Sequence, residues 1–443
     1  MLREKIENAS RSVMLCALLI APAVCTAAPT FTVDTFTVDD RADLIDDNVA
    51  DGVCHTAANT CTLRAAIMQA NRSTGLGATI VLPPGTYQLT RARSGADGED
   101  SGDLNLTTPA SGDPLITIQG AGESITTIDA NQLDGVINVA PFRTATIEGL
   151  TIQGGNTGGD GGGILNAGYL SLDHVRLAYN SAQSGGAIFS FSAAAVLVVS
   201  QCEFVANTAA LAGGGLFNNA AARVTASTFA FNTAMYGGGI ENYGGLTLID
   251  STLAGNEATK DGGGIDSLGS PQTVTDIYSS TIAYNDADED RDGVGSGGGV
   301  HIGFTSGSGG VFSIRNTLLA GNTYANSPQT DDCSVDSGAA LYSYGRNLFG
   351  SSDGCTISIV SGTWNYFNGS LGGLQNNGGP TDTIALRSGG NAIDGGDPAQ
   401  GCVDDAGNTI ATDQRGFART VGSQCDIGAY EFDPDRIFTD GFD

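Results

Sequence analysis

Three side chains that could carry acid–base chemistry, Glu241, Asp266 and His301, each stand two residues after a run of glycines. Residues at this place in successive segments form a column of Leu165, Phe189, Phe217, Glu241, Asp266 and His301. The residue just before each of them is apolar, so strand alternation predicts that the column points outward. Neighbouring carboxylates there could share a proton or bind a cation, and phenylalanine rings could stack on sugars. The column is therefore the candidate catalytic site of a polysaccharide lyase or glycoside hydrolase.

The same column has a simpler interpretation, a solvated strand face with scattered charges. Supporting motifs are missing from the sequence, which has none of the NTD, GHG or RIK blocks of polygalacturonases. It also lacks the clustered basic residues of a pectate lyase. The sequence favours the simpler interpretation, and catalysis is the alternative.

A second candidate site is an acidic insertion in which Asp286, Asp288, Asp290 and Asp292 alternate with other residues and Gly293 follows. Oxygen ligands at alternate positions followed by a sharp glycine turn match the first half of a calcium-binding loop. The glutamate that closes such loops is replaced here by glycine. The insertion is thus either a calcium site, which would make calcium the one expected cofactor, or a flexible acidic loop.

Six cysteines fall into close sequence pairs, which predicts disulfides rather than a zinc site, since no CxxC motif is present. The expected pairs are Cys54 with Cys61, Cys333 with Cys355, and Cys402 with Cys425. The remaining Cys202 falls in a column of small residues and is expected to be a buried, unreactive thiol.

The elements that must position these residues recur along the chain. A short alternating strand ends in asparagine and is followed by small residues, glycines and a second strand, at intervals of roughly 24 to 37 residues. The asparagines are Asn156, Asn180, Asn207, Asn232, Asn256, Asn285 and Asn322. Stacked coils would place these side chains about 4.8 Å apart, so that they hydrogen-bond up the stack. The glycines supply bends with positive φ.

One apolar column fixes the fold class. Three residues before each asparagine stand Leu177, Phe204, Phe229, Leu253, Ile282 and Leu319, which must face inward. Strands this short, repeated at this period, predict an all-β protein, a right-handed single-stranded parallel β-helix of the pectin-lyase-like fold. The stack is expected to have roughly ten or eleven coils. A short helix containing Leu63, Ala66, Ile67 and Ala70 is expected to cover its first coil.

The beginning of the chain and its charge indicate where it acts. Arg3, Lys5 and Arg11 precede the apolar run from Val13 to Val24, the pattern of a secretory signal peptide that would be cleaved near Ala27 or Ala28. No later segment is long and apolar enough to span a bilayer. The formal net charge is −29. Such a chain repels phosphate backbones, so it is not expected to bind nucleic acid. The predicted location is secreted, extracellular or on the outer cell surface.

Gly185-Gly186-Ala187-Ile188 and the strand end from Phe204 to Asn207 resemble the repeats of polymorphic outer membrane proteins, which are β-helical surface proteins. The resemblance covers roughly residues 144–325 and implies an adhesin-like surface. Too few residues follow the last coil to build the outer-membrane barrel in which those proteins usually end.

Both ends of the mature chain resemble other bacterial secreted proteins. Residues 29–72, with Cys61-Thr62-Leu63-Arg64-Ala65-Ala66-Ile67, look like a CSLREA domain, in which Arg64 is expected to form a salt bridge. Residues 371–432 resemble a choice-of-anchor Q domain through four ordered blocks, Leu374–Pro380, Asn391–Gly396, Asp413–Gly416 and Cys425–Glu431. The expected domains are therefore a signal peptide (1–28), a cap (29–72), a β-helix (73–370), the anchor-like region (371–432) and a tail (433–443) that could serve as a sorting tag.

Together these features predict a non-catalytic β-helical protein that is secreted or held at the cell surface. Its expected role is adhesion or interaction with the extracellular matrix, with polysaccharides or cell-surface glycans as partners.

Overall fold

The computed structural model describes residues 33–435, apart from 74, 96–97, 109–111, 113, 270–272, 305–309 and 326–329. The predicted signal peptide and residues 436–443 of the predicted tail lie outside the described residues. The described residues belong to one compact unit that begins at Val33.

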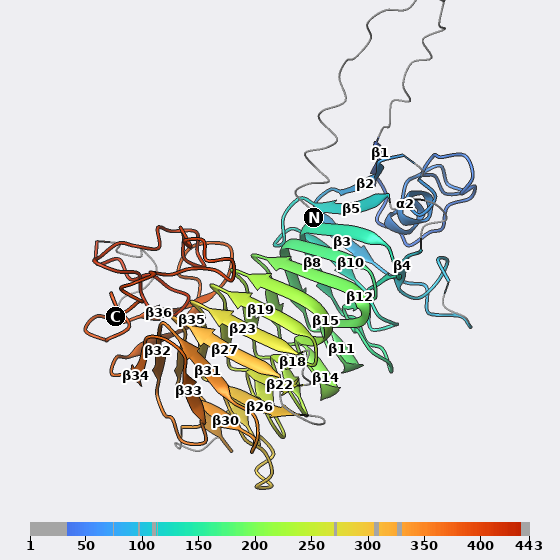
Figure 1. Cartoon of the computed structure of the whole chain (residues 1–443). Helices are drawn as coiled ribbons and strands as arrows, with labels where there is room; N and C mark the ends of the chain where they lie inside the picture. Colours follow the sequence, from blue (N-terminus) through green and yellow to red (C-terminus); the bar gives the residue numbers. More distant parts are fainter. Residues whose placement is uncertain are drawn as a thin grey trace, which may run out of the picture. The chain divides into compact units, whose positions relative to one another are not determined.

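The fold is a right-handed parallel β-helix, as predicted, in which each regular coil passes through four faces (Figure 1). Face A is the longest, and its strands pair in parallel from β1 to β33. Among the described residues it holds twelve strands, close to the expected number of coils. They are β1 (Val33–Thr37), β2 (Gly77–Leu82), β5 (Leu115–Gly120), β8 (Thr144–Gln153), β10 (Tyr169–Ala178), β12 (Ile188–Ser200), β15 (Leu216–Thr225), β19 (Gly245–Ile249), β23 (Val274–Tyr278), β27 (Val311–Arg315), β31 (Leu341–Tyr344) and β33 (Ile357–Ile359).

Face B follows face A in each coil and is also parallel, and β8 and β10 run through both faces. Its other strands are β3 (Gly85–Gln88), β6 (Thr126–Asp129), β13 (Glu203–Val205), β16 (Thr228–Ala230), β20 (Thr252–Ala254), β24 (Thr281–Ala283), β28 (Leu318–Ala320), β32 (Arg346–Phe349) and β34 (Thr363–Tyr366). Face C is a separate sheet of short strands, β11 (Ser181–Ser184), β14 (Thr208–Ala212), β17 (Thr233–Ala234), β21 (Glu257–Ala258), β25 (Asp286–Ala287) and β29 (Thr323–Tyr324).

Face D closes the coil and includes the first halves of β12 and β15. Its remaining strands are β4 (Leu104–Leu106), β7 (Ile137–Val139), β9 (Ile164–Asn166), β18 (Ile240–Asn242), β22 (Ile265–Gly269), β26 (Val300–Phe304) and β30 (Cys333–Val335). The predicted inward column is confirmed: Leu177, Phe204, Phe229, Leu253, Ile282 and Leu319 are fully buried in one continuous core.

The asparagine ladder runs up the corner between faces B and C. The side-chain amide of Asn207 donates to Asn232 Oδ1 at 2.9 Å and to the carbonyl of Leu177 at 2.9 Å. Its own oxygen accepts from the amide of Asn180. The same pattern continues through Asn322, which donates to Asp332 Oδ1 at 2.7 Å. The ladder therefore satisfies buried polar groups in each coil.

The prediction was wrong for Asn156, which is exposed. Gly155 takes the corner, and its backbone N–H donates to Asn180 Oδ1 at 3.0 Å. A Cβ atom there would lie 1.9 Å from the carbonyl oxygen of Gly162, so this corner has no room for a side chain. The ladder consequently begins one coil later than the sequence pattern indicated.

The helix α2 (Leu63–Ala70) forms where it was expected and is capped by the Thr62 side chain. Arg64 forms the expected salt bridge, with its Nε 2.6 Å from Asp43 Oδ1 and both side chains buried. Because β1 pairs with β2, the stack already begins inside the region expected to be a separate cap. No helix among the described residues is long and apolar enough to cross a membrane.

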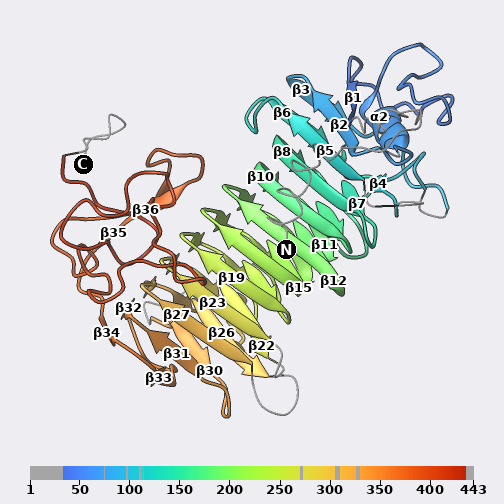
Figure 2. The same ribbon diagram turned by 45° about the horizontal axis from the view of Figure 1, so that its top comes forward.

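The C-terminal segment, residues 371–435, folds back along the outside of face B (Figures 1 and 2). It holds one antiparallel pair, β35 (Leu371–Gln375) and β36 (Thr383–Leu386), and irregular loops. Thr252 Oγ1 donates to Gln414 Oε1 at 2.6 Å, and Thr281 Oγ1 accepts from the backbone of Ala429 at 3.0 Å. Outward threonines of face B thus hold this segment in place.

All three predicted disulfides are present, Cys54–Cys61, Cys333–Cys355 and Cys402–Cys425. Cys202 is free and buried, as predicted. Its sulfur lies 3.4 Å from the backbone nitrogen of Val175, in the column that Ser227 and Ser251 continue on the next coils. Burial raises the pKa of the Cys202 thiol, which keeps the thiol protonated and unreactive.

We expect Asn232→Ala to lower the free energy of unfolding by about 3 kcal/mol or more, because several buried groups lose a partner at once. These groups are the backbone N–H and side-chain amide of Asn207, the carbonyl of Phe204 and the side-chain oxygen of Asn256. Urea unfolding measures the loss. Asn156→Ala is the matched control and should change stability little, and equal losses in the two variants would contradict the ladder's role.

Candidate functional site

The candidate catalytic column lies on face D, where Glu241, Asp266 and His301 stand on β18, β22 and β26 in direct register. The adjacent Ile240, Ile265 and Val300 belong to the core, so the three side chains do point away from it. The expectation of a solvent-exposed column is nevertheless wrong for these three. Their exposed fractions are 0%, 1% and 6%.

The glycine turns provide the physical reason for this burial. The positive-φ glycine before each strand folds the chain back over the outer face of that strand. A Cβ atom on Gly262 would lie 2.6 Å from Asp266 Cβ, and one on Gly297 would lie 2.8 Å from the nitrogen of His301. The turns that were expected only to bend the coil therefore also cover the column.

Within this buried column Asp266 and His301 form a pair, with Nδ1 of His301 2.8 Å from Asp266 Oδ1. Burial works to lower the pKa of His301, but the hydrogen bond and charge of Asp266 outweigh it and raise this pKa to about 9. Burial raises the pKa of Asp266 more than His301 lowers it. The outer nitrogen of His301 lies 3.6 Å from Oδ1 of the exposed Asp336.

Glu241 differs because neither of its carboxyl oxygens has a hydrogen-bond partner among the described residues. Tyr243 and Asp266 lie near enough to influence its pKa, although neither makes a hydrogen bond of ordinary geometry with it. Burial, followed by the charge of Asp266, raises this pKa well above its usual value. A protonated Glu241 above an Asp266–His301 ion pair leaves the group neutral overall, as a buried site requires.

The acidic insertion brings together three of the four predicted calcium ligands. Carboxylate oxygens of Asp288, Asp290 and Asp292 all lie within 4.8 Å of one another. Asp288 also accepts the backbone N–H of Gly293, and Lys260 Nζ lies 2.6 Å from Asp292 Oδ2. Part of the negative charge is therefore already balanced by protein groups.

Asp286 is not a member of this cluster. It lies in β25, where Oδ1 accepts a hydrogen bond from the Thr323 hydroxyl at 2.5 Å. The alternation of aspartates in sequence suggested four equivalent ligands. The strand, however, ends at Ala287 and Asp288 takes a left-handed conformation, which turns the chain away from Asp286.

A row of exposed aromatic side chains, which the sequence interpretation missed, lies at the corner between faces B and C. Tyr179, Phe231 and Tyr284 are 60%, 56% and 44% exposed. Each directly precedes an asparagine of the ladder. An aromatic residue before every second ladder asparagine was the signal that could have revealed them. We call these three residues the aromatic row.

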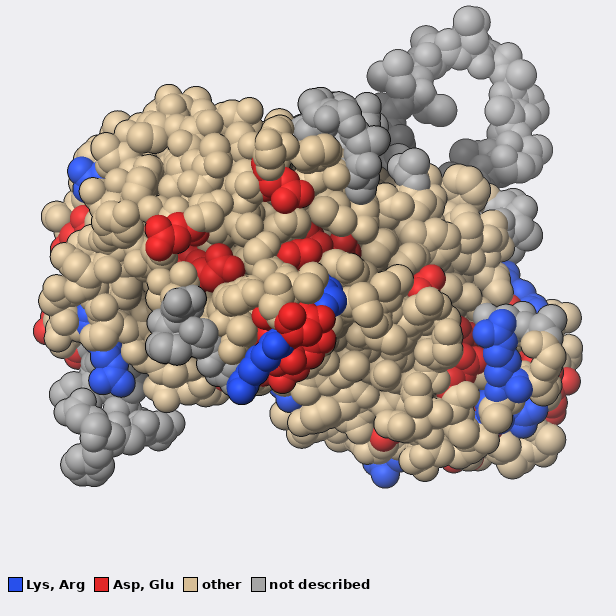
Figure 3. Space-filling model, turned by 90° about the horizontal axis from the view of Figure 1, so that it is seen from below, with Lys and Arg blue, Asp and Glu red and all other residues tan. Residues whose placement is uncertain are grey.

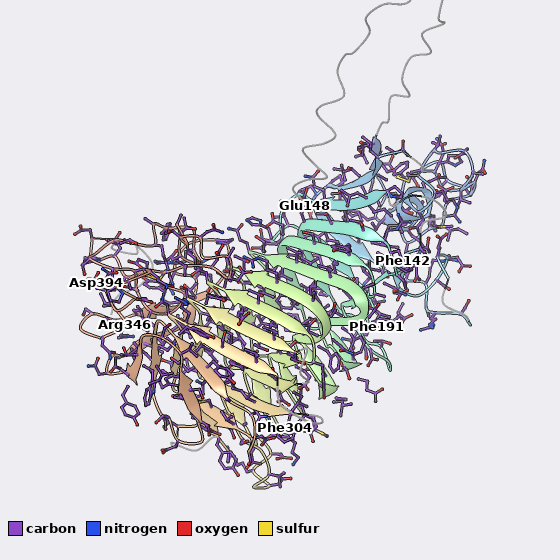
Figure 4. The ribbon with its side chains drawn as sticks, viewed as in Figure 1. Phe142, Glu148, Phe191, Phe304, Arg346 and Asp394 are labelled. Carbon is purple, nitrogen blue, oxygen red and sulfur yellow. A yellow bond between two sulfur atoms is a disulfide. The ribbon has the colours of Figure 1, made fainter. Side chains whose placement is uncertain are left out.

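Other exposed aromatic residues occupy different parts of the surface. Phe142, Phe191 and Phe304 lie along the edge where face D leads into face A, whereas Glu148 lies toward the opposite end of β8 (Figure 4). Phe142 is 71% exposed. The aromatic row is therefore distinct from this second edge.

Comparisons with known proteins add a fold similarity and no family. No model of a known protein family matches the chain, and no curated protein matches it in sequence. One similar solved structure is described as the crystal structure of pectate lyase Pel9A, with a TM-score of 0.46 and 15% sequence identity. The alignment covers 91% of this chain and 98% of that one.

The raised pKa of Glu241 predicts how pH acts on stability. Because the folded-state pKa lies above the unfolded value near 4.5, the unfolded chain loses this proton first as pH rises, and folding becomes less favourable. Glu241→Gln removes this effect, so its free energy of unfolding should exceed that of the wild type at pH 8, with the difference shrinking toward pH 4.

Urea unfolding at several pH values measures this difference. Glu148→Gln, which alters a partly exposed carboxyl on β8, is the control (Figure 4). A pH dependence that is the same in both variants would show that the buried position of Glu241 is not its cause.

Proposed function

We propose that this protein is a secreted or cell-surface β-helical protein that interacts with glycans without transforming them, in adhesion or in the extracellular matrix. The observation that carries the proposal is the contrast between its two candidate surfaces. Glu241, Asp266 and His301 are buried beneath glycine turns, whereas the aromatic row stands exposed on the outside of the coils. A polymer can reach the second surface and not the first.

The predicted signal peptide and three disulfides support a location outside the cytoplasm, since disulfides persist in oxidising compartments. The resemblances to CSLREA and choice-of-anchor Q domains support the same location and remain proposals. Within the anchor-like region the four sequence blocks contact one another. The Arg415 side chain donates to the carbonyls of Asn377 and Glu431, and the backbone N–H of Asp394 donates to the Asp426 carboxylate. These contacts are consistent with one folded unit.

The alternative is a polysaccharide lyase or hydrolase that uses Glu241, Asp266 and His301. Such an enzyme needs its acid and base within hydrogen-bonding reach of the sugar. Turnover would therefore require the glycine turns over face D to open. The turns are joined by continuous backbone hydrogen bonds, such as those from the N–H of Gly238 to the carbonyl of Gly262 and from the N–H of Gly239 to the carbonyl of Gly263, and these bonds disfavour that opening.

We expect the purified mature protein to release neither new reducing ends nor unsaturated products from neutral and acidic polysaccharides, with or without calcium. The expectation follows from the burial of the only acid–histidine column that the sequence singled out. Turnover that disappears in Glu241→Gln or Asp266→Asn would overturn the non-catalytic proposal and place an active site on face D.

We further propose that calcium binds the loop through Asp288, Asp290 and Asp292. Their close oxygens supply the hard ligands that calcium prefers. Millimolar calcium should then raise the melting temperature, and chelation should reverse the change, because a ligand that binds only the folded state stabilises it. Calorimetry of the wild type and Asp290→Asn measures this effect, with Asp286→Asn as the control outside the cluster. An equal response in the wild type and Asp290→Asn would exclude the site.

A further inference from the structure

The aromatic row has a regular spacing along the stack. The register of face B aligns positions 178, 205, 230, 254, 283 and 320 on successive coils, so the residues that follow them form one column. This column reads Tyr179, Ala206, Phe231, Gly255, Tyr284 and Gly321. Aromatic rings therefore occupy every second coil, with small residues between them.

The backbone at this column favours glycine, yet three positions hold large rings. Tyr179, Phe231 and Tyr284 have φ values of 56°, 56° and 61°, in the left-handed region. Gly255 and Gly321 hold the same place with φ of 63° and 72°. Bulky residues rarely adopt this conformation because it costs conformational energy, and such strain is concentrated at functional sites. Packing offsets this cost only in part, since about half of each side chain stays exposed.

The glycines between the rings let the rings lie against the stack. A Cβ atom on Gly255 would lie 2.8 Å from Phe231 Cε1, and one on Gly321 would lie 3.1 Å from Tyr284 Cε1. The rings of Phe231 and Tyr284 therefore extend over the backbone of the next coil, and both side chains stay partly exposed to solvent. At its far end the row meets the C-terminal segment, where the Tyr284 hydroxyl donates to the carbonyl of Gly372 at 3.2 Å.

The spacing matches one kind of ligand. Parallel coils are about 4.8 Å apart, so rings on alternate coils are separated by about 10 Å, and the row from Tyr179 to Tyr284 spans about 19 Å. In an extended β-1,4-linked chain alternate sugars turn over, and two sugars together are close to this separation in length. Every second sugar would then present the same face to an aromatic ring.

A polar column lies beside the row, two residues further along each coil on face C. It consists of Ser181, Thr208, Thr233, Glu257 and Asp286. The hydroxyl of Thr233 lies 3.2 Å from that of Thr208. Asp286 is buried, but the other four side chains reach the surface and give roughly one polar group for each sugar along that part of the row. Hydroxyls and carboxylates are suitable partners for sugar hydroxyls.

The charge of the protein further limits the class of glycan that the row could bind. Glu257 and Asp286 lie beside the row, and the formal net charge of −29 repels polyuronates and sulfated glycans. On the face drawn in Figure 3, acidic side chains gather in a few clusters, and uncharged side chains cover most of the surface. The surroundings therefore favour an uncharged chain.

We propose that the aromatic row binds an extended, neutral, β-1,4-linked glycan along the stack, with every second sugar on Tyr179, Phe231 or Tyr284 and the hydroxyls of intervening sugars against the polar column. The proposal rests on the glycan-binding function proposed above and names its ligand class.

Phe231→Gly tests the row without threatening the fold, because Gly255 already occupies this corner on the next coil. Isothermal titration with hexasaccharides of β-1,4-linked glucose, xylose and mannose measures binding, and polygalacturonate represents acidic chains. We expect one neutral hexasaccharide to bind, its disaccharide to bind at least tenfold more weakly, and Phe231→Gly to weaken hexasaccharide binding at least about tenfold. Urea unfolding should show equal or greater stability, since the strained residue is removed.

The matched control is Phe142→Gly, which removes an exposed phenylalanine with a φ of 64° from a different corner (Figure 4). It should bind as the wild type does. If the wild type binds a glycan and Phe231→Gly binds it equally well, the proposal for the row is overturned. A preference of the wild type for polygalacturonate would overturn it too. Either result leaves the glycan-binding function standing. If the wild type binds none of the glycans tested, acidic chains included, both the proposal for the row and the glycan-binding function are overturned.

Discussion

The buried asparagine ladder is the interaction on which the rest of the structure depends. Each amide donates to the next coil's oxygen and to a carbonyl of the preceding coil, while its own oxygen accepts from the preceding amide and backbone. A shift of one coil by one residue would leave buried polar groups unpaired on both sides of the shift, which costs more than any single contact adds. The ladder therefore fixes the register between coils, and every functional column inherits that register.

Two columns show what this register does to chemistry. On face D it places Glu241, Asp266 and His301 on consecutive coils, close enough for the histidine to pair with one carboxylate and for the other carboxyl to keep its proton. At the corner between faces B and C it places Tyr179, Phe231 and Tyr284 directly before ladder residues. Similar spacing thus gives a buried, neutralised group in one column and an exposed array in the other. The difference arises because the glycine turns fold over the column on face D, whereas the aromatic row stays exposed.

Much of this arrangement could be predicted from the sequence because it is periodic. The alternation of apolar residues correctly predicted that Phe204 and Phe229 face inward, and close spacing in sequence correctly predicted the three cysteine pairs. The burial of Glu241 could not be predicted. Alternation separates side chains that face the core from those that point outward, but it does not indicate that a glycine turn covers the outer side of the strand. Gly155 takes the place expected for Asn156 because the carbonyl of Gly162 leaves no room for a side chain there, and this close approach has no signal in the repeat pattern.

The C-terminal segment illustrates the same limit and also explains which surfaces remain open. It carries no repeat, so nothing in its pattern predicted that Gln414 would bond to Thr228 and Thr252 or that Arg419 would lie 3.3 Å from the buried Asp250. These contacts cover the outer side of face B along several coils.

The C-terminal segment reaches the aromatic row at Tyr284 and, by its contact there, bounds the row at one end. A ligand on the row would therefore extend from this boundary toward Tyr179. The ladder behind the row is held by hydrogen bonds in both directions along the stack, so the rings lie on a corner of each coil that is fixed by buried hydrogen bonds. Rigid presentation lowers the entropy lost on binding, which is what a repetitive surface needs in order to hold a long, flexible polymer.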